Sequence, residues 1–302
     1  MTVDRSHDNE ARAATGESAE EPEPPKAVVA VFEAGTRRRA IPRWMSDAME
    51  SPLATIVPIL LAIALWELAS RVGILDRVFF PPPTTIGKAF WGLATDGTLI
   101  TETFSTLRRF AAGFIVGAVP AIFLGVAMAR IWWIRAFIDP IISVLYPIPS
   151  VAYLPLLLVI FGLGSPPIIA LAAILSFYPS VINSAAAIRQ VDEKLQRMSE
   201  NMGASRTQTL FKITLPAAMP TIFAGLRLAA GAALLGVVVG EFVASGDGIG
   251  AKTWRYWQIY QIDRMYATLV VIASLGLIVT QAGLMVQRRF FGWHEQIRRD
   301  ME

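Results

Sequence analysis

Histidine and cysteine, which most hydrolytic and metal sites use, are missing from the apolar part of this sequence. Among 302 residues there is no cysteine, and the two histidines, His7 and His294, lie in polar ends. Nucleophilic triads and most metal centres need an imidazole or a thiolate beside the reacting atoms. No G-x-x-x-x-G-K-[ST] loop occurs either, so the usual cradle for ATP phosphates is missing. We therefore expect no catalytic residue, no metal site and no cofactor bound by this chain.

Four charged residues fall inside otherwise apolar stretches, where a charge is costly and often has a function: Glu67, Asp139, Arg227 and Glu241. Only Arg227 is expected to lie deep in the membrane. Arg227 carries a guanidinium that is always ionised and donates in a fork, so it could attract an oxyanion in a pore. It could equally pair with a neighbouring acid or carbonyl, or reach the membrane surface. Glu241 could contribute to a gate, or pair with Lys252 or Arg255. Both Arg227 and Glu241 are candidates for a translocation path.

A second candidate group surrounds the stretch YPIPSVAYLP at residues 146–155. Its prolines interrupt any continuous helix, and broken backbone at membrane depth is tolerated where protein packs around it or where it lines a wet cavity. The alternative is a proline kink that serves only helix packing. We expect this stretch and part of the next apolar block to line the path, with the candidates Tyr146, Pro147, Pro149, Tyr153, Ser176, Tyr178 and Asn183.

The composition indicates which elements must position these residues. Hydrophobic residues make up 54% of the chain and charged residues only 17%, which is more apolar than a soluble domain needs. Each of six apolar blocks approaches the ~20 residues that cross a bilayer core. We expect an all-α membrane protein with six transmembrane helices, at residues 53–70, 109–129, 137–161, 166–188, 217–243 and 266–286. The net charge of +3, with scattered basic residues, argues against nucleic acid as a partner.

The ends of the chain differ from this apolar domain. Residues 1–43 are acidic and rich in Ala, Glu and Pro, so we expect a disordered cytoplasmic tail. The six-span domain covers residues 44–292, and residues 293–302 form a cytoplasmic C-terminal tail. Lys and Arg concentrate in the loops that face the cytoplasm if both termini lie inside, which predicts an N-in, C-in topology. Arg108 and Arg109, at the predicted outer start of the second span, run against this rule.

An amphipathic segment lies between the fourth and fifth apolar blocks. Leu195, Met198 and Met202 recur at helical spacing, with charged residues between them. Gly203 lies where the first of two short helices should end, and Pro216 should open the next element. The pattern fits a helix that lies flat on the membrane, and it also fits a docking element for another protein.

This segment resembles the EAA loop of the inner-membrane permease subunits of bacterial ABC importers. The pattern of that loop is EAA, three residues, G, nine residues, I, one residue and LP. Its second half is matched here by Gly203, Ile213, Leu215 and Pro216. Its EAA positions are occupied by Arg197, Met198 and Ser199, which depart from it. We expect the coupling element to span residues 196–212.

The resemblance extends over residues 50–292 and points to the nitrate, sulfonate and taurine branch of these permeases. It is carried by FPPPTTIGKAF, STLRRFAAGFIVGAVPAIFLGVAMA, YPIPSVAYLPLLLVIFGLG and GEFVASGDGIG as well as by the loop. It implies a type I importer permease in the bacterial inner membrane: a homodimeric pore, two ABC subunits that bind the ATP, and an extracytoplasmic solute-binding protein. The solute would be a sulfonate, nitrate or a related small organic anion. ATPase coupling is assigned to Arg197, Met198, Met202, Gly203, Arg206, Leu210, Phe211, Ile213, Leu215 and Pro216.

Two of the predicted loops lie on the outer side of the membrane in this topology. Residues 71–107 contain a proline run followed by Thr84 or Thr85 as a helix cap. Residues 245–265 combine glycines with Trp and Tyr, which fit an interfacial belt first and contact with the binding protein second. A secondary carrier is the competing class. Such a carrier would need carboxylates in the membrane to bind a coupling ion, and the sequence has few of them. It would also need an inverted repeat, and none is visible in the sequence.

Overall fold

The computed structural model describes the backbone of residues 52–299 and the side chains of residues 56–289. The chain divides into two compact units, residues 1–62 and 63–302, and the described part of the first is the start of helix α4 (Pro52–Val72). All regular elements in the described range are helical. Those that follow α4 are α5 (Pro83–Thr95), α6 (Thr98–Arg130), α7 (Trp132–Leu145), η1 (Ser150–Tyr153), α8 (Leu154–Phe161), α9 (Ser165–Arg189), α10 (Glu193–Asn201), α11 (Arg206–Thr209), η2 (Leu210–Thr214), α12 (Leu215–Ala244), α13 (Ile249–Gln258) and α14 (Ile262–Arg299).

Four helical stretches of the described chain are long and apolar enough to cross a membrane. They are α6, α9, the continuous stretch Arg206–Ala244, and α14 over Ile262–Arg289. Each contains one of the predicted blocks, although α6 begins well before the predicted residue 109. The backbone of α14 runs to Arg299, through most of the predicted tail at 293–302. The predicted tail at 1–43 lies outside the described residues.

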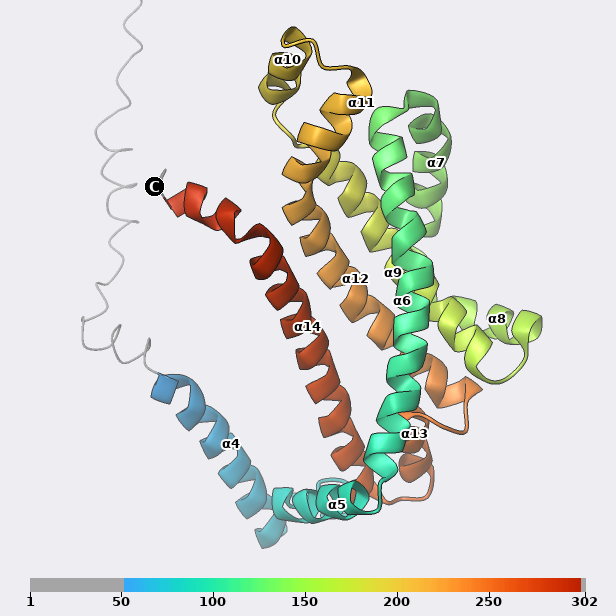
Figure 1. The fold of residues 1–302 in the computed structure, drawn as a ribbon. Coiled ribbons are helices and arrows are strands. Elements are labelled where there is room, and N and C mark those ends of the chain that lie inside the picture. The colour runs from blue at the N-terminus through green and yellow to red at the C-terminus, as the bar shows by residue number, and fades with distance from the viewer. Residues whose placement is uncertain (1–51, 300–302) are drawn as a thin grey trace, which may run out of the picture. The chain divides into compact units, whose positions relative to one another are not determined.

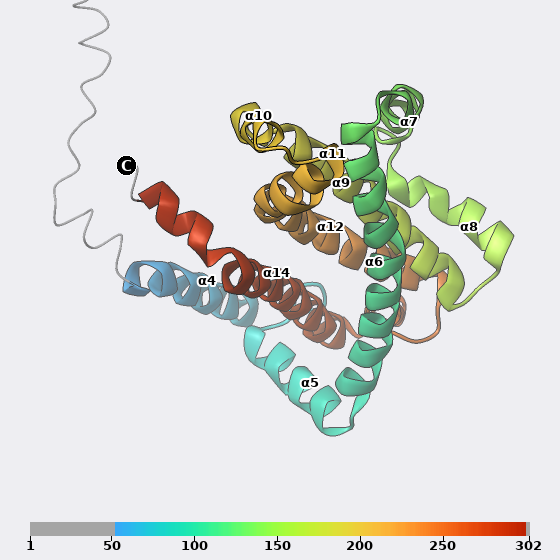
Figure 2. The same ribbon diagram turned by 45° about the horizontal axis from the view of Figure 1, so that its top comes forward.

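The predicted third span, residues 137–161, is not one helix. The pair formed by α7 and residues 150–161 is bent by 91°, so these residues form either a broken span or a re-entrant loop. Pro149 precedes η1 and Pro155 lies in the first turn of α8, where its missing N–H costs little. Figure 2 shows α7 nearly end-on while α8 runs across the view. The predicted interruption at YPIPSVAYLP is confirmed.

The long helices α6, α9 and α12 form the core of the second unit, with α9 packed against both of the others (Figure 1). Small residues permit the close approach. A Cβ atom at Gly117 of α6 would overlap the Ala173 carbonyl of α9, and one at Gly225 of α12 would overlap Asn183 of α9. Close backbone approach through small residues is a common way to join helices in membranes. Gly117 and Gly225 therefore serve packing.

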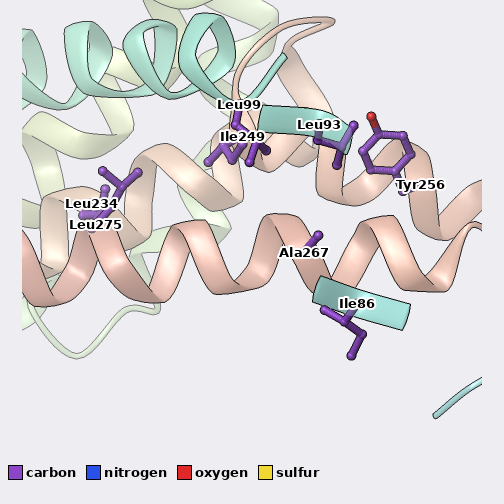
Figure 3. Packing of buried hydrophobic residues seen from close by; sticks show 8 residues of the cluster. All are labelled: Ile86, Leu93, Leu99, Leu234, Ile249, Tyr256, Ala267 and Leu275. Atoms are coloured by element: carbon purple, nitrogen blue, oxygen red, sulfur yellow. The ribbon is translucent and has the colours of Figure 1, made fainter. Parts of the chain in front are cut away.

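A hydrophobic cluster closes the end of the bundle that lies opposite α10 and α11 (Figure 3). It joins α5, α6, α12, α13 and α14 through Ile86, Leu93, Leu99, Leu234, Ile249, Tyr256, Ala267 and Leu275. At the same end, Trp66 of α4 meets Tyr266 of α14 edge-on, with ring centroids 5.6 Å apart. These contacts place the short helices α5 and α13 firmly against α14.

Helix α5 receives its cap from another helix. The prediction that Thr84 or Thr85 caps it is wrong, because the N-cap residue is Pro82 and no side-chain cap bond forms there. The Glu67 carboxylate of α4 instead accepts hydrogen bonds from the Thr84 amide (3.0 Å) and hydroxyl (2.9 Å). A carboxylate suits this place because the first N–H groups of a helix are free and carry partial positive charge.

Candidate functional site

The chain between α9 and α12 folds into a helical hairpin, residues 192–214. Asp192 caps α10 by accepting a hydrogen bond from the Lys194 amide at 2.8 Å. Gly203 follows α10 with φ of +84°, the left-handed conformation that favours glycine, as the sequence predicts. Ser205 and Gln208 form a reciprocal capping box at the start of α11. Local chemistry therefore defines both limbs of the 192–214 hairpin.

The second limb of the hairpin runs without a break into α12. Pro216 lies in the first turn of α12, as the sequence predicts, although no break precedes that helix, because Arg206–Ala244 is one helical stretch. In a regular α-helix the ring of Pro216 would meet the carbonyl of Lys212, four residues earlier. The chain forms the π-helical turn η2 just before the proline, and this wider turn makes room for the ring. The second limb of the hairpin is thus the first part of a long apolar helix.

The hairpin exposes an apolar surface. Met198 is 60% exposed, Met202 87% and Phe211 62%. Arg197 lies beside them in an exposed ion pair with Glu193 at 2.9 Å. Of the other predicted coupling residues, Arg206 and Pro216 are exposed and Leu210, Ile213 and Leu215 are half-buried. Exposed apolar side chains rimmed by charges are typical of a surface that another protein covers.

The bend between α7 and α8 brings together part of the predicted path. Tyr146 meets Tyr178 of α9 edge-on, with ring centroids 6.0 Å apart. Tyr153 of η1 packs on the same helix, against the cluster that contains Leu171 and Leu175. A cavity of about 190 Å³ opens beside Tyr178, between α6 and α9. Pro147 and Pro149 lie exposed in the bend itself.

Ser176 and Asn183, also on α9, lie in contacts between helices. Ser176 is fully buried against Gly117 of α6, and its hydroxyl donates to the Ala173 carbonyl at 3.1 Å. The Asn183 amide donates to the Pro179 carbonyl at 2.8 Å, while its Cβ packs on α12. In this structure these two side chains stabilise the core rather than lining the cavity beside Tyr178.

Arg227 lies half-buried on the side of α12 that faces α14. Its aliphatic stem packs against Gly283, which leaves room for it because that residue has no side chain. Among the described residues its guanidinium has no acidic partner. An unpaired cation of this kind is free to attract an anion.

Glu241 lies in a buried polar cluster at the opposite end of the bundle from the hairpin. We define the polar cluster as Glu102, Thr106, Arg109, Glu241, Asp247 and Lys252. Arg109 Nη1 donates to Glu241 at 2.8 Å, and the two side chains are 2% and 0% exposed. The predicted pairing of Glu241 with Lys252 or Arg255 is wrong, because Lys252 pairs with Glu102 at 3.1 Å. Glu241 is enclosed here and faces no open cavity.

Further hydrogen bonds satisfy the two glutamate carboxylates of the polar cluster. Glu241 accepts from the Thr106 hydroxyl at 2.9 Å and from the Gly250 amide at 3.0 Å. Glu102 accepts from the Gly248 amide. Buried charges are tolerated only when they are paired and fully hydrogen-bonded in this way. The polar cluster therefore fastens the segment that follows α12 onto α6.

Arg109 is the functional residue that sequence reasoning missed. It lies within α6 rather than in a loop, and its partners Glu241 and Asp247 are 132 and 138 residues away along the chain. It is therefore not a loop charge of the kind that sets topology, which removes it from the exceptions to the predicted orientation. The glycines of GEFVASGDGIG were the available signal, since they let this segment approach Glu241.

Asp247 lies in the loop between α12 and α13, outside the membrane-spanning helices. Burial raises the pKa of its carboxyl, but hydrogen bonds from Ser245 and Arg109 outweigh that effect and lower the pKa to about 2. The ordinary value is 3.8, so the folded state holds this proton less tightly than the unfolded state. The stability that this carboxylate adds to the folded state is therefore present above pH 3.8, and it is lost as the pH falls through about 2.

Comparisons with known proteins agree with these features. The sequence model of the family described as "binding-protein-dependent transport system inner membrane component" matches residues 121–292, from α6 to α14. The chain is 32% identical over 213 residues to the nitrate import permease protein NrtB of Synechocystis. The aligned region covers 70% of this chain and 76% of NrtB. It is 26% identical over 261 residues to the taurine transport system permease protein TauC of Escherichia coli, which covers 85% and 95%.

A solved structure shows the same fold. A chain of the inward-facing MetNI methionine ABC transporter superposes with a TM-score of 0.58 at 20% identity. The match covers 65% of this chain and 98% of that chain. At this level of identity the likeness concerns the fold alone.

Proposed function

Because this chain belongs to the family of binding-protein-dependent transport system inner membrane components, we propose that its 192–214 hairpin docks the ATP-binding subunit of an importer. The chain itself is a multi-pass permease subunit of the plasma membrane. It carries no phosphate loop, so the energy for transport comes from a partner that binds the ATP. The hairpin is where that partner's motion enters the permease.

One observation carries this proposal: Met198, Met202 and Phe211 form an exposed apolar surface on a hairpin that is stiffened by caps at both limbs. A short amphipathic helix laid into a groove is a common recognition mode between proteins. Methionine suits it because its flexible thioether side chain fills irregular pockets. Figure 1 shows α10 projecting beyond the end of α12, where a partner could reach it.

The proposed topology has six spans with both termini in the cytoplasm. The spans are α4, α6, the bent α7–α8 pair, α9, α12 and α14. The hairpin then lies in the cytoplasm together with its basic residues Arg197, Arg206 and Lys212, as the positive-inside rule requires. The polar cluster lies at the extracytoplasmic end.

The proposed assembly contains two copies of this chain, two ATP-binding subunits and one extracytoplasmic solute-binding protein. Each chain offers one docking hairpin, so two copies accommodate a pair of ATPase subunits. The binding protein meets the end that carries α5 and α13, where Trp257 and Tyr260 are exposed. Those aromatic side chains also suit a membrane–water interface, which supports a position of this end at the surface of the bilayer.

The proposed solute is a sulfonate, nitrate or a related small anion. Relatives of this chain are named for taurine and nitrate transport. Arg227 lacks an acidic partner among the described residues, and Tyr146, Tyr153 and Tyr178 bring hydroxyl donors to the bend. Charge-assisted and hydroxyl hydrogen bonds are the contacts that oxyanions accept. We assign these four residues to the translocation path.

The test of hairpin docking is Met202→Glu. Placing a charge at the most exposed of the three apolar residues should leave membrane insertion intact and reduce recovery of the ATP-binding subunit with tagged permease at least tenfold. Thr101→Glu is the control, since it adds the same charge in the first turn of α6, where an acid is favourable and no docking of the ATP-binding subunit is proposed. Recovery of the ATPase with Met202→Glu at the level of the control would refute hairpin docking.

A further inference from the structure

Two buried hydroxyl groups join the limbs of the 192–214 hairpin. Ser199 of α10 and Thr209 of α11 are 5% and 1% exposed, and their hydroxyl oxygens are 2.9 Å apart. The residues next to them along the chain are mostly exposed, namely Met198, Glu200 and Gln208, whereas Leu210 is half-buried. Buried polar pairs of this kind specify one arrangement, because each group would be unsatisfied in any other.

The direction of the hydrogen bond follows from the number of hydrogens. Ser199 Oγ also lies 2.8 Å from the Gln196 carbonyl, which can only accept. A hydroxyl has one hydrogen to donate, so Ser199 donates to Gln196 and accepts from Thr209. The chain of bonds runs from Thr209 through Ser199 to the backbone of α10. Removal of the Ser199 hydroxyl leaves the buried Thr209 donor without this acceptor, and removal of the Thr209 hydroxyl leaves Ser199 bonded only within its own helix.

This pair is the principal side-chain bridge between α10 and the long helix. In the described structure α10 packs mainly on α11 and η2, rather than on α9 or α12 themselves. The Ala204 amide adds a bond to the Ser199 carbonyl at 3.0 Å, so the turn at Gly203 closes on the same residue. Thr209 belongs to the continuous stretch Arg206–Ala244 and immediately precedes the π-helical turn. A push on α10 therefore reaches α12 through Ser199 and Thr209.

The position of Ser199 in the sequence distinguishes this chain from the EAA pattern. It occupies the last position of the EAA pattern, where alanine would offer no hydrogen bond. We propose that Ser199 and Thr209 are positioning residues that make α10 and the Arg206–Ala244 helix move as one body, so that ATPase motion reaches the membrane span. This inference rests on the proposed docking of the ATPase at the hairpin. It differs from docking because neither hydroxyl lies on the exposed surface.

The experiment uses the complete transporter in proteoliposomes, assembled from this chain, its ATP-binding subunit and its binding protein. The binding protein is first titrated with taurine, methanesulfonate and nitrate, and the anion that it binds serves as the uptake probe. Ser199→Ala and Thr209→Val are compared with the wild type in two measurements. The first is recovery of the ATP-binding subunit, and the second is the number of solute molecules taken up per ATP hydrolysed.

We expect both variants to recover the ATPase like the wild type and to transport at least threefold fewer solute molecules per ATP. The double variant should be no worse than either single one, because both changes break the same bond. Thr209→Ser keeps the hydroxyl and should restore the ratio. Ser274→Ala and Thr280→Val, which remove exposed hydroxyls from α14, are the matched controls and should change neither measurement.

Two outcomes would overturn the inference. An unchanged ratio in Ser199→Ala and Thr209→Val would show that the hydroxyl pair does not transmit motion. Loss of the ATPase from these variants would show that the pair shapes the docking surface instead. Failure of docking itself is distinguishable, because it is read from Met202→Glu, whose substitution leaves Ser199 and Thr209 in place.

Discussion

Arg109 and Glu241 can be buried only together. Removing either charge from water costs several kcal/mol, and the mutual attraction offsets this only where the geometry also satisfies the remaining donors and acceptors. Arg109 meets that condition through the Glu241 carboxylate, the Asp247 side chain and carbonyl, and the Ser165 hydroxyl at 3.0 Å. The pair therefore contributes more to the specificity of this arrangement than to its net stability.

Arg109→Ala should destabilise the protein by about 3–5 kcal/mol, because it leaves Glu241 charged, buried and without its cation. The midpoint of thermal unfolding in detergent measures the effect. Arg135→Ala is the control, since Arg135 forms an exposed pair with Asp139 at 3.4 Å and should cost below about 1 kcal/mol. Equal midpoints for the two variants would contradict the buried pair.

At the scale of elements, the polar cluster determines how α12 connects to α13. The Gly248 amide binds Glu102, the Ile249 amide binds the Thr106 hydroxyl and the Gly250 amide binds Glu241. Three successive amides at the start of α13, which would otherwise be free, thus find acceptors on α6 and α12. The loop is therefore shaped by side chains from other helices in addition to its own bonds between Ser245 and Asp247.

Gly248→Ala should disrupt this connection. Gly248 has φ of +103°, which side chains rarely adopt, and a Cβ atom there would overlap the Glu241 carboxyl group. The strain from the backbone alone is about 1–3 kcal/mol, and the overlap adds to it. Gly246→Ala in the same loop is the control, because its surroundings are open. Limited proteolysis of the loop should proceed faster for Gly248→Ala and at the wild-type rate for Gly246→Ala; equal rates for all three proteins would argue against this role of Gly248.

At the scale of the whole molecule, the two ends of the bundle carry different surfaces. One end presents the 192–214 hairpin with its apolar and basic residues, and the other presents α5 and α13 with exposed Trp and Tyr (Figure 1). A permease that receives energy on one side of the membrane and solute on the other needs this polarity. The helices α6, α9 and α12 run between both ends and connect them.

The chain contains no cysteine, which makes its orientation directly measurable. In right-side-out vesicles, Tyr260→Cys should react with a membrane-impermeant maleimide, because residue 260 is exposed at the proposed outer end. Met202→Cys, at the proposed cytoplasmic end, should react only after the vesicles are permeabilised. Labelling in the opposite order would reverse the topology.

The sequence by itself determined the class, the family resemblance and the local chemistry of the hairpin. These depend on apolar runs of membrane length, on a glycine where the chain must adopt positive φ, and on prolines that interrupt a helix. Such signals are read within a few residues of one another. For that reason four of the six span blocks, the turn at Gly203 and the break before α8 could be predicted.

Only the tertiary structure decided which polar groups meet. Arg109 and Glu241, Glu67 and Thr84, and Ser199 and Thr209 are joined by the packing of helices or by the closing of a hairpin. A buried charge or hydroxyl is satisfied by whichever partner the fold brings within hydrogen-bond distance, and no periodicity in the sequence records that choice. The π-helical turn was also decided by the tertiary structure. It makes room for the ring of Pro216 within a helical stretch that packing keeps continuous.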